Sequence, residues 1–472
     1  MDQTELPLVS ALAAAANRSD AAFHTPGHKR GQSAPSALLE LFGKSTFRSD
    51  LPELPELDNL FAPEGAIAQA QLLAADAFGA EQTWFLANGS TCGIEAAVLA
   101  TCNPDDKLIL PRNMHQSAIA ALILSGAVPI FVLPEYDAGW DIAHPPAAKE
   151  IAQALHDHPD AKAVLIVSPT YHGVCADVSA IAQLTHAAGL PLIVDEAHGA
   201  HFAFHPDLPT PALSAGVDLV VQSTHKTLSA LTQAAMLHAQ GKRIDRARLS
   251  ASLRLVQSTS PNYLLLASLD AARQQMALEG KDLLDRTLRL SDRARHELSK
   301  IPGLRVLQAN SLDRTRLTIG LMDFGRSGFE VDEELLAVGI AAELPALRHI
   351  TFILSIGTID ADIDRLIAAF QQLDRRDRKS TPFPQIPNSQ VGIANCLPPR
   401  SAFFCARTAV SFADAIDRLS AETVCPYPPG IPLLIPGEPI TREAIDYLQQ
   451  VIALGGIVTG CDRERLQVVS LS

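Results

Sequence analysis

The chain has 472 residues, which is more than a single hydrophobic core usually spans, so its length predicts about two or three domains. Hydrophobic residues make up 47% and charged residues 19% of the chain, proportions that exclude a disordered protein and indicate a globular one. The formal net charge of −14 argues against nucleic acid or an anionic membrane surface as a main partner.

The cysteines and the N-terminus both favour a cytoplasmic location. The seven cysteines form no CxxC pair, so they fit a reducing compartment and give no metal-site spacing. Residues 1–20 lack the basic start of a signal peptide, and their alanine-rich centre predicts an amphipathic helix. The longest uncharged stretch, 117–133, contains Gly126 and Pro129 and falls short of the about 20 residues that cross a bilayer. We therefore expect no metal and no membrane partner.

Two polar segments follow the first helix. The basic segment FHTPGHKRG (23–31) surrounds a Pro-Gly turn and is either an anion-facing loop or a solvated turn. The acidic segment 50–65 is punctuated by prolines and predicts an extended arm. Its carboxylates either face water or meet a cationic group, and they are Asp50, Glu53, Glu56 and Asp58.

From residue 66 onward, short apolar runs alternate with helical segments. Strands are predicted at 83–86, 107–110, 128–133, 163–167, 192–195 and 219–222. Helices are predicted at 66–79, 88–102, 115–124 and 177–188. This alternation predicts an α/β fold with a mostly parallel central sheet and helices on both faces, and it places ligand groups at the carboxyl ends of the strands.

The second half of the chain changes character twice. Residues 242–300 carry no strand signal and predict helices, whereas strands at 316–322 and 351–356 and a helix near 332–338 predict a small α+β region. The charged, proline-rich segment 375–390 predicts a linker. We expect an N-terminal helix and arm (1–60), a large domain (61–300), a small α+β domain (301–380) and a C-terminal domain (390–472).

Lys226 is the first candidate for chemistry. It follows the predicted strand 219–222, and a second apolar run, 234–237, comes soon after it. In an apolar neighbourhood, desolvation lowers the pKa of a lysine and favours the neutral amine that attacks an aldehyde. The alternative is a solvated lysine after a strand, which is the commoner situation.

Three further motifs lie at strand ends or helix starts. NGST (88–91) begins a helix, so the Ser90 and Thr91 hydroxyls can bind an anion or simply cap the helix. His115 opens the next helix and has either a functional or a structural role. Asp195 ends a strand in VDEAHGAHF and is followed by His198, so its carboxylate either caps a turn or holds a cationic ring nitrogen.

Together these motifs supply what pyridoxal 5′-phosphate (PLP) needs from a protein. The phosphate needs a helix N-terminus and hydroxyl groups, and the aldehyde needs a lysine. The pyridine nitrogen needs an anion that keeps it protonated, and the ring needs a flat partner. The order along the chain is the phosphate turn, the stacking residue, Asp195 and then Lys226.

The chain resembles the ornithine/lysine/arginine decarboxylase family of fold-type I PLP enzymes. The resemblance covers nearly the whole sequence and is closest to the short arginine-decarboxylase-like members, which lack an N-terminal wing domain. The most specific blocks are QSTHKTLSALTQAAMLH and YPPGIPLLIPGE. The other matching segments are FHTPGHKRG, ELDNLFAPEGAI, NGST, RNMHQS, SPTYHGV, VDEAHGAHF, STSPNY and FILSIGT.

The resemblance implies a role for each candidate residue. Lys226 would bind the PLP aldehyde, Asp195 would pair with the pyridine nitrogen, and His115 would stack on the ring. His198 would have a supporting or proton-handling role beside Asp195. The residues expected around the phosphate are Ser90, Thr91, Ser223 and His225. Thr259, in STSPNY, would contact the phosphate of the neighbouring subunit in a homodimer or a dimer-based oligomer.

The resemblance implies decarboxylation of a basic L-amino acid, which we expect to be arginine, giving agmatine and CO2 in polyamine metabolism. Lysine and ornithine are alternative substrates, and the 50–58 arm and Glu438 are candidates to bind the cationic end of the substrate. A PLP aminotransferase or lyase of the same fold is another alternative, because Arg348 could hold a substrate carboxylate. A catalytically silent regulatory subunit is the non-enzyme alternative.

Overall fold

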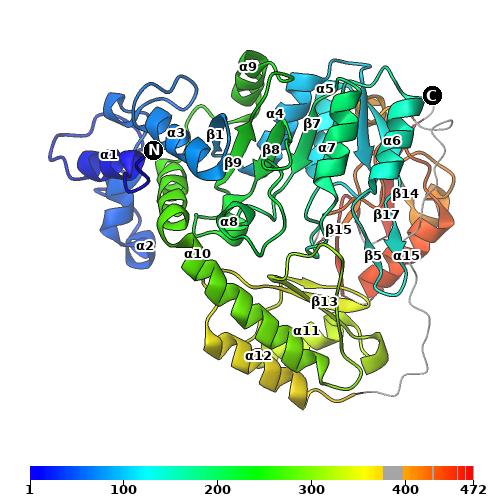
Figure 1. Ribbon diagram of the computed structural model, residues 1–472. Coiled ribbons are helices and arrows are strands. Elements are labelled where there is room, and N and C mark those ends of the chain that lie inside the picture. Colours follow the sequence, from blue (N-terminus) through cyan, green and yellow to red (C-terminus); the bar gives the residue numbers. More distant parts are fainter. Residues whose placement is uncertain (376–396, 428–429, 454, 463, 471–472) are drawn as a thin grey trace. The chain divides into compact units, whose positions relative to one another are not determined.

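The structure is a computed structural model that describes residues 1–375, 397–427, 430–453, 455–462 and 464–470 (Figure 1). The chain divides into two compact units. Unit 1 consists of residues 1–100 and 193–284, and unit 2 consists of residues 101–192 and 285–472. In the described ranges, no helix combines the length and the apolar character that crossing a membrane requires.

Unit 1 contains a four-strand portion of sheet and the helices around it. Its strands are β1 (Gln82–Leu86), β7 (Leu192–Asp195), β8 (Leu219–Gln222) and β9 (Ala235–Ala239). Its helices are α1 (Pro7–Ala16), α2 (Ser36–Ser49), η1 (Pro55–Leu57), α3 (Ala66–Phe78), α4 (Gly89–Thr101), η2 (Phe202–Phe204), α8 (Thr224–Thr227), α9 (Arg246–Val256) and the first part of α10 (Tyr263–Ser299). β7 and β8 are parallel, whereas β9 pairs antiparallel with both β8 and β1, so β9 alone runs against its neighbours.

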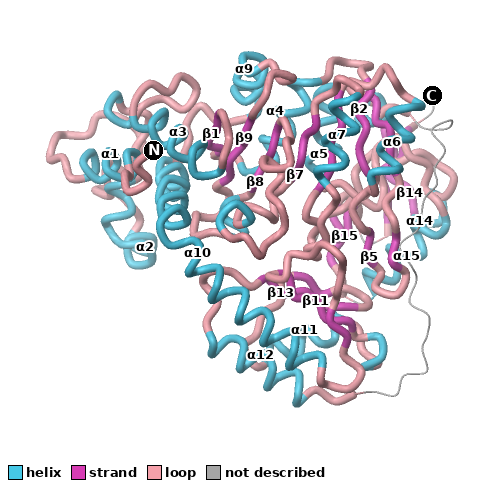
Figure 2. Tube along the Cα trace, viewed as in Figure 1, coloured by secondary structure: helices cyan, strands magenta, loops and turns pink. Residues whose placement is uncertain are grey.

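Unit 2 contains parallel strands, a small antiparallel sheet and the C-terminal elements (Figure 2). Its strands are β2 (Lys107–Pro111), β3 (Val128–Val132), β4 (Tyr136–Asp137), β5 (Ile142–Ala143), β6 (Ala163–Val167), β10 (Arg305–Val306), β11 (Arg316–Gly320), β12 (Leu344–Pro345), β13 (His349–Ile353), β14 (Arg407–Ser411), β15 (Cys425–Tyr427), β16 (Ile457–Thr459) and β17 (Arg465–Val469). Its helices are α5 (Gln116–Ser125), α6 (Ala148–Asp157), α7 (Val178–Ala187), η3 (Met322–Phe324), α11 (Gly328–Ala337), α12 (Asp360–Gln372), α13 (Pro399–Phe404), α14 (Phe412–Ala415), α15 (Arg442–Ala453) and the second part of α10.

The predicted α/β alternation is confirmed. The strands predicted between 83 and 222 all occur, each within one residue of its expected ends. β2 pairs parallel with β3 and with β6, as β7 does with β8, so the sheet strands are mostly parallel. Helix α3 ends at Phe78 because Gly79 adopts a left-handed conformation (φ 76°) that side chains disfavour.

One helix of the structure was not predicted, and one predicted segment lies outside the described residues. Helix α2 was not predicted, and its φ of 73° at Gly43 marks a kink inside it. The predicted linker at 375–390 lies outside the described residues from 376 onward. The division into four domains therefore stays a prediction.

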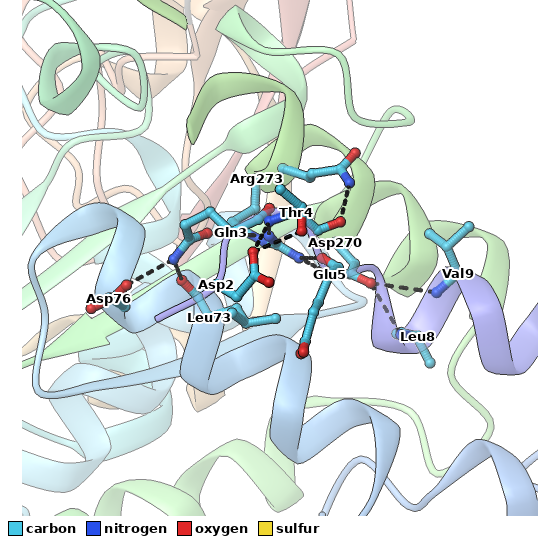
Figure 3. Close-up of polar contacts among 11 residues, drawn as sticks. Asp2, Gln3, Thr4, Glu5, Leu8, Val9, Leu73, Asp76, Asp270 and Arg273 are labelled. Carbon is cyan, nitrogen blue, oxygen red and sulfur yellow. Dashed lines mark hydrogen bonds and ion pairs between the residues drawn. The ribbon is translucent and has the colours of Figure 1, made fainter. Parts of the chain in front are cut away.

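A buried ion pair holds the N-terminal segment against α10 within unit 1 (Figure 3). The Asp270 and Arg273 side chains are both 0% exposed and contact one another. Asp270 Oδ2 accepts a hydrogen bond from Leu8 N at 3.0 Å, at the start of α1. Arg273 donates to the backbone oxygens of Gln3 and Glu5, at 2.9 and 2.7 Å. The pair therefore satisfies backbone groups of the first residues of the chain.

A buried histidine pair joins the 168–175 segment to the small sheet of unit 2. His349 Nδ1 donates to Trp140 O at 3.0 Å, so its Nε2 accepts from His172 Nε2, also at 3.0 Å. Burial lowers the pKa of His349 to about 4, and it holds the pKa of His172 well below its usual range. Only a neutral His349 can accept the hydrogen bond from His172.

This pair predicts a loss of stability in acid. The folded protein binds a proton at His349 less readily than the unfolded chain does, so the stabilising contribution is complete above pH 6.5 and is lost as the pH falls toward about 4. The thermal midpoint should fall less steeply over this pH range in His349→Asn than in the wild type. His296→Asn, at a position with a 70% exposed side chain, should keep the wild-type slope. Parallel slopes for the wild type and His349→Asn would contradict this assignment.

Candidate active site

Lys226 lies in unit 1, in the short helix α8 that follows β8. Its side chain is half-buried, and Nζ contacts His198 Nε2 at 3.1 Å. His198 is itself buried, in the turn that follows β7. The structure therefore brings the predicted lysine together with the histidine for which the resemblance implies a supporting or proton-handling role.

Asp195, at the end of β7, has the properties of a carboxylate that binds a cationic partner. It is 4% exposed, and Oδ1 accepts a hydrogen bond from Ala197 N at 3.1 Å. Among the described residues, none donates a hydrogen bond to Oδ2. Burial raises the pKa of Asp195, and the positive charge of Lys226 acts in the opposite direction. A cationic N–H group facing Oδ2 would stabilise the ionised form in the same way.

Two of the predicted phosphate residues meet at the start of α4. Ser223 Oγ donates to Ser90 Oγ at 2.7 Å, across 133 residues of sequence. Gly89, with a φ of 77°, makes the turn into α4, and Thr91 is exposed in its first turn. Hydroxyl groups beside the backbone N–H groups of a helix start are suited to bind a phosphate.

His225 is half-buried and donates from Nδ1 to Ala234 O at 3.0 Å. This bond leaves Nε2 as the nitrogen that can face a ligand. Burial, more than the charge of Lys226, lowers the pKa of His225. The neutral ring is therefore the favoured form.

Two glutamines that were not predicted hold the turn before α4. Gln233 Nε2 donates to Ala87 O at 2.7 Å, and Ala87 N donates to Gln257 Oε1 at 2.9 Å. Thr259 is exposed two residues after Gln257. Its predicted contact with a neighbouring subunit stays a prediction.

His115 lies in unit 2, at the N-cap of α5. Its Nδ1 accepts a hydrogen bond from Ser117 N at 3.2 Å, so the ring has a structural role at the helix start. Gln116 N donates to Gly430 O at 3.1 Å, which connects the same helix start to the C-terminal block. Stacking of His115 on a cofactor ring stays a prediction.

The acidic candidates for binding the substrate side chain have partners within the chain. Asp58 accepts hydrogen bonds from backbone N–H groups at the start of α3, including Gly65 N at 2.8 Å. Asp50 contacts His28, Glu56 pairs with Arg18, and Glu53 accepts from Asn59 and Leu60. These contacts favour a structural role for the arm.

Glu438 is likewise engaged. Arg112 Nε and Nη2 donate to its two oxygens at 2.9 and 2.7 Å, and Ile435 N donates to Oε2. Arg112 also donates to Pro432 O and Leu433 O, so this bidentate pair fixes the C-terminal block next to the strand end of β2. Arg348 donates to Ala138 O at 3.1 Å.

The residues of unit 1 fit PLP. Asp195 is a buried carboxylate with an oxygen available for a ring N–H, Lys226 is a half-buried amine, and Ser90 and Ser223 form a hydroxyl pair at a helix start. The phosphate, the aldehyde and the ring nitrogen of the cofactor thus each have a partner of the right chemistry.

Comparison with known families identifies two matches. The sequence model described as Orn/Lys/Arg decarboxylase, major domain, matches residues 6–320. The model described as Orn/Lys/Arg decarboxylase, C-terminal domain, matches residues 404–464.

Individual proteins agree with these matches. The arginine decarboxylase of Bacillus subtilis (strain 168) is 38% identical over 486 residues, which cover 99% of this chain and 98% of the relative. The arginine decarboxylase of Bacillus anthracis is 36% identical and covers 99% and 97%. The crystal structure of the Francisella novicida lysine decarboxylase LdcF superposes with a TM-score of 0.85 at 23% identity, over 98% of this chain and 81% of that one. This likeness confirms the predicted fold class.

Proposed function

This chain is a member of the Orn/Lys/Arg decarboxylase family, and on that premise we propose that it converts L-arginine to agmatine and CO2 with PLP as cofactor. The observation that carries the choice of arginine is the similarity over 99% of the chain to relatives named arginine decarboxylase. A relative named lysine decarboxylase is 32% identical over only 60% of this chain, and two others are 23% identical. We further propose that the enzyme acts in the cytoplasm, in polyamine metabolism.

Residues of unit 1 would hold the cofactor. Lys226 would bind its aldehyde, Asp195 its ring nitrogen, and Ser90, Ser223 and His225 its phosphate. When bound, PLP supplies an electron sink for the electrons released with CO2. Asp195 would favour the protonated ring nitrogen, because a cationic N–H group stabilises a buried carboxylate.

Lys226 and His198 are placed to handle protons. Their nitrogens are 3.1 Å apart, so one proton can be shared between Nζ and Nε2. Decarboxylation requires a proton at Cα after CO2 leaves, and release of the amine requires a second transfer. Shielding of His198 from solvent favours delivery of this proton from the pair rather than from bulk water.

The experiment that tests this function offers arginine, lysine and ornithine separately to the purified enzyme with PLP. Agmatine and CO2 should form from arginine, with the highest kcat/KM of the three substrates. If cadaverine is the preferred product, the substrate is lysine, and if putrescine is preferred, the substrate is ornithine. A keto acid in place of CO2 would indicate an aminotransferase, and an intact PLP absorbance band without turnover would indicate a regulatory subunit.

The Asp195→Asn variant should retain PLP but lose turnover. The amide has the shape of the carboxylate but no charge, so the ring nitrogen loses its proton and the electron sink weakens. We expect kcat to fall on the order of 10²–10³-fold, with PLP still detected by absorbance. Asp207→Asn, at an exposed position of the same unit, should be unaffected. Near-normal kcat in Asp195→Asn would remove Asp195 from this role.

We also propose that the enzyme is a homodimer in which Thr259 contacts the phosphate of the neighbouring subunit. Thr259 is exposed in its own chain, which leaves its hydroxyl accessible to a second copy. Light scattering of the enzyme should give twice the 50.4 kDa chain mass. A monomer with full activity would contradict this assembly.

A further inference from the structure

A chain of hydrogen bonds between buried side chains crosses the strands of unit 1. Glu196 Oε2 accepts from Gln222 Nε2 at 2.7 Å, and Gln222 Oε1 contacts His238 Nε2 at 3.1 Å. His238 Nδ1 then contacts Thr83 Oγ1 at 2.8 Å. The four residues are at most 2% exposed. Glu196 directly follows β7, and Gln222, His238 and Thr83 lie in β8, β9 and β1.

The positions of the hydrogens follow from the two ends of this chain. Glu196 Oε1 already accepts from Ala212 N at 2.8 Å, so as a carboxylate Glu196 receives a donor on each oxygen. Gln222 donates its amide to Glu196, and its carbonyl oxygen must therefore accept from His238 Nε2–H. The remaining nitrogen of His238 accepts from the Thr83 hydroxyl. Every polar atom along the path is paired when His238 is neutral.

Burial favours the neutral ring of His238, because it lowers the pKa of His238 to about 3. Burial also raises the pKa of Glu196 to about 8, although the hydrogen bonds from Gln222 and Ala212 act in the opposite direction. The protonated form of Glu196 keeps the same pairs with the direction of the hydrogen bonds reversed, so the path stays connected in either form. The ring of Phe78 stacks on His238 at a centroid distance of 4.8 Å and shields it from water. These hydrogen bonds therefore form a polar network that is shielded from water inside an apolar layer.

Strand register places this hydrogen-bond chain on the face of the sheet opposite to Asp195. Thr83 pairs with His238, and His238 pairs with Val220, so Gln222 lies on the same face two residues further along β8. Asp195 pairs with Val221 and lies on the opposite face. This hydrogen-bond chain can therefore affect the cofactor residues only through the backbone of the strands.

Two residues of the hydrogen-bond chain, Glu196 and Gln222, are neighbours of cofactor residues in the sequence. Glu196 follows Asp195, and Glu196 N donates to Val221 O at 2.9 Å, which extends the β7–β8 pairing past the strand end. The turn to His198 wraps closely around the Glu196 side chain, because a Cβ on Gly199 would lie 2.7 Å from Glu196 Cγ. Gln222 precedes Ser223 and lies four residues before Lys226.

We propose that Glu196, Gln222, His238 and Thr83 are positioning residues that hold the backbone segments of Asp195 and Lys226 at the separation PLP requires. The proposal rests on the proposed function, because it assumes that these two residues bind PLP. The effective feature is the continuity of hydrogen bonds from β7 to β1, and not the charge of Glu196.

Methionine variants interrupt the chain of hydrogen bonds, and a glutamine variant preserves it. Glu196→Met removes the acceptor for Ala212 N and Gln222, and Gln222→Met leaves Glu196 Oε2 and His238 Nε2 without their partner. In Glu196→Gln, rotation of the Gln222 amide and a shift of the His238 proton from Nε2 to Nδ1 reconnect every pair in the reverse direction. The glutamine variant therefore lacks the charge but keeps the continuity.

The test measures PLP affinity by absorbance titration, and the pH titration of the bound cofactor, in each holoenzyme. We expect PLP affinity to fall by about tenfold or more in both methionine variants, since each leaves buried polar groups unpaired, with a displaced pH titration. Glu196→Gln should bind PLP within about threefold of the wild type, because its buried groups stay paired.

Controls separate this role from a general loss of stability. Thr318→Val removes a buried hydroxyl pair, Thr318–Thr351, in the small sheet of unit 2. It should lower the thermal midpoint without changing PLP affinity. Wild-type affinity in both methionine variants would overturn the proposal, and so would a Glu196→Gln variant as weak as Glu196→Met. A wild-type enzyme that binds no PLP would instead overturn the proposed function.

Discussion

Replacement of Lys226 by alanine is expected to abolish the decarboxylase activity and the absorbance band of the bound cofactor. The amine is the only group that the site offers for the aldehyde among the residues assigned above, and its contact with His198 also supplies the proton transfer. Loss of both functions should lower kcat/KM on the order of 10³-fold or more. The absorbance spectrum after reconstitution with PLP, and CO2 release from arginine, measure the two effects separately.

A matched control is the exposed Lys242 of the same unit. Lys242→Ala should keep both the absorbance band and the rate. If Lys226→Ala keeps the band while Lys242→Ala loses it, the assignment of the aldehyde-binding lysine is wrong. If both variants keep full activity, neither lysine takes part in the reaction.

The largest expected effect on stability comes from Asp270→Ala. This change leaves the Arg273 guanidinium buried without its carboxylate, and it removes the acceptor of Leu8 N at the start of α1 (Figure 3). Removing one partner of a buried ion pair costs about 3–5 kcal/mol of folding free energy. The thermal midpoint should fall, and the N-terminal segment should become susceptible to limited proteolysis before the rest of the chain.

Asp76→Ala is the control for this experiment. Asp76 also contacts the N-terminal segment, through the Met1 amino group at 2.8 Å, but both partners are more than 40% exposed. Exposed ion pairs contribute little to stability, so the midpoint should stay unchanged. Equal losses in the two variants would show that burial of the Asp270–Arg273 pair does not determine its contribution.

Much of the fold follows from local patterns. The run Ala163–Val167 forms the predicted strand without any shift, because its short length and its β-branched residues favour a buried strand over a helix. Gly79 ends α3 where a left-handed residue was needed. In contrast, α2 was not predicted, since none of its residues is buried and its apolar pattern is interrupted by the kink at Gly43.

The candidate site was predicted in part. Asp195, Lys226, Ser90 and Ser223 lie in unit 1, where Ser223 contacts Ser90 and the charge of Lys226 acts on Asp195. The sequence left open whether the arm carboxylates face water or bind a ligand. Asp58 instead accepts hydrogen bonds at the start of α3, a pairing that no spacing rule indicates.

The sequence by itself determined which residue types follow which strands, because a strand end and a helix start are encoded by neighbouring residues. From these it determined the α/β order, the family and the order of the cofactor residues. Only the tertiary structure decided which buried polar groups pair. Thr83 meets His238 across 155 residues, and Leu8 meets Asp270 across 262. The physical reason is that a buried donor must find an acceptor in the folded chain, and the packing of the whole unit decides which acceptor is close enough.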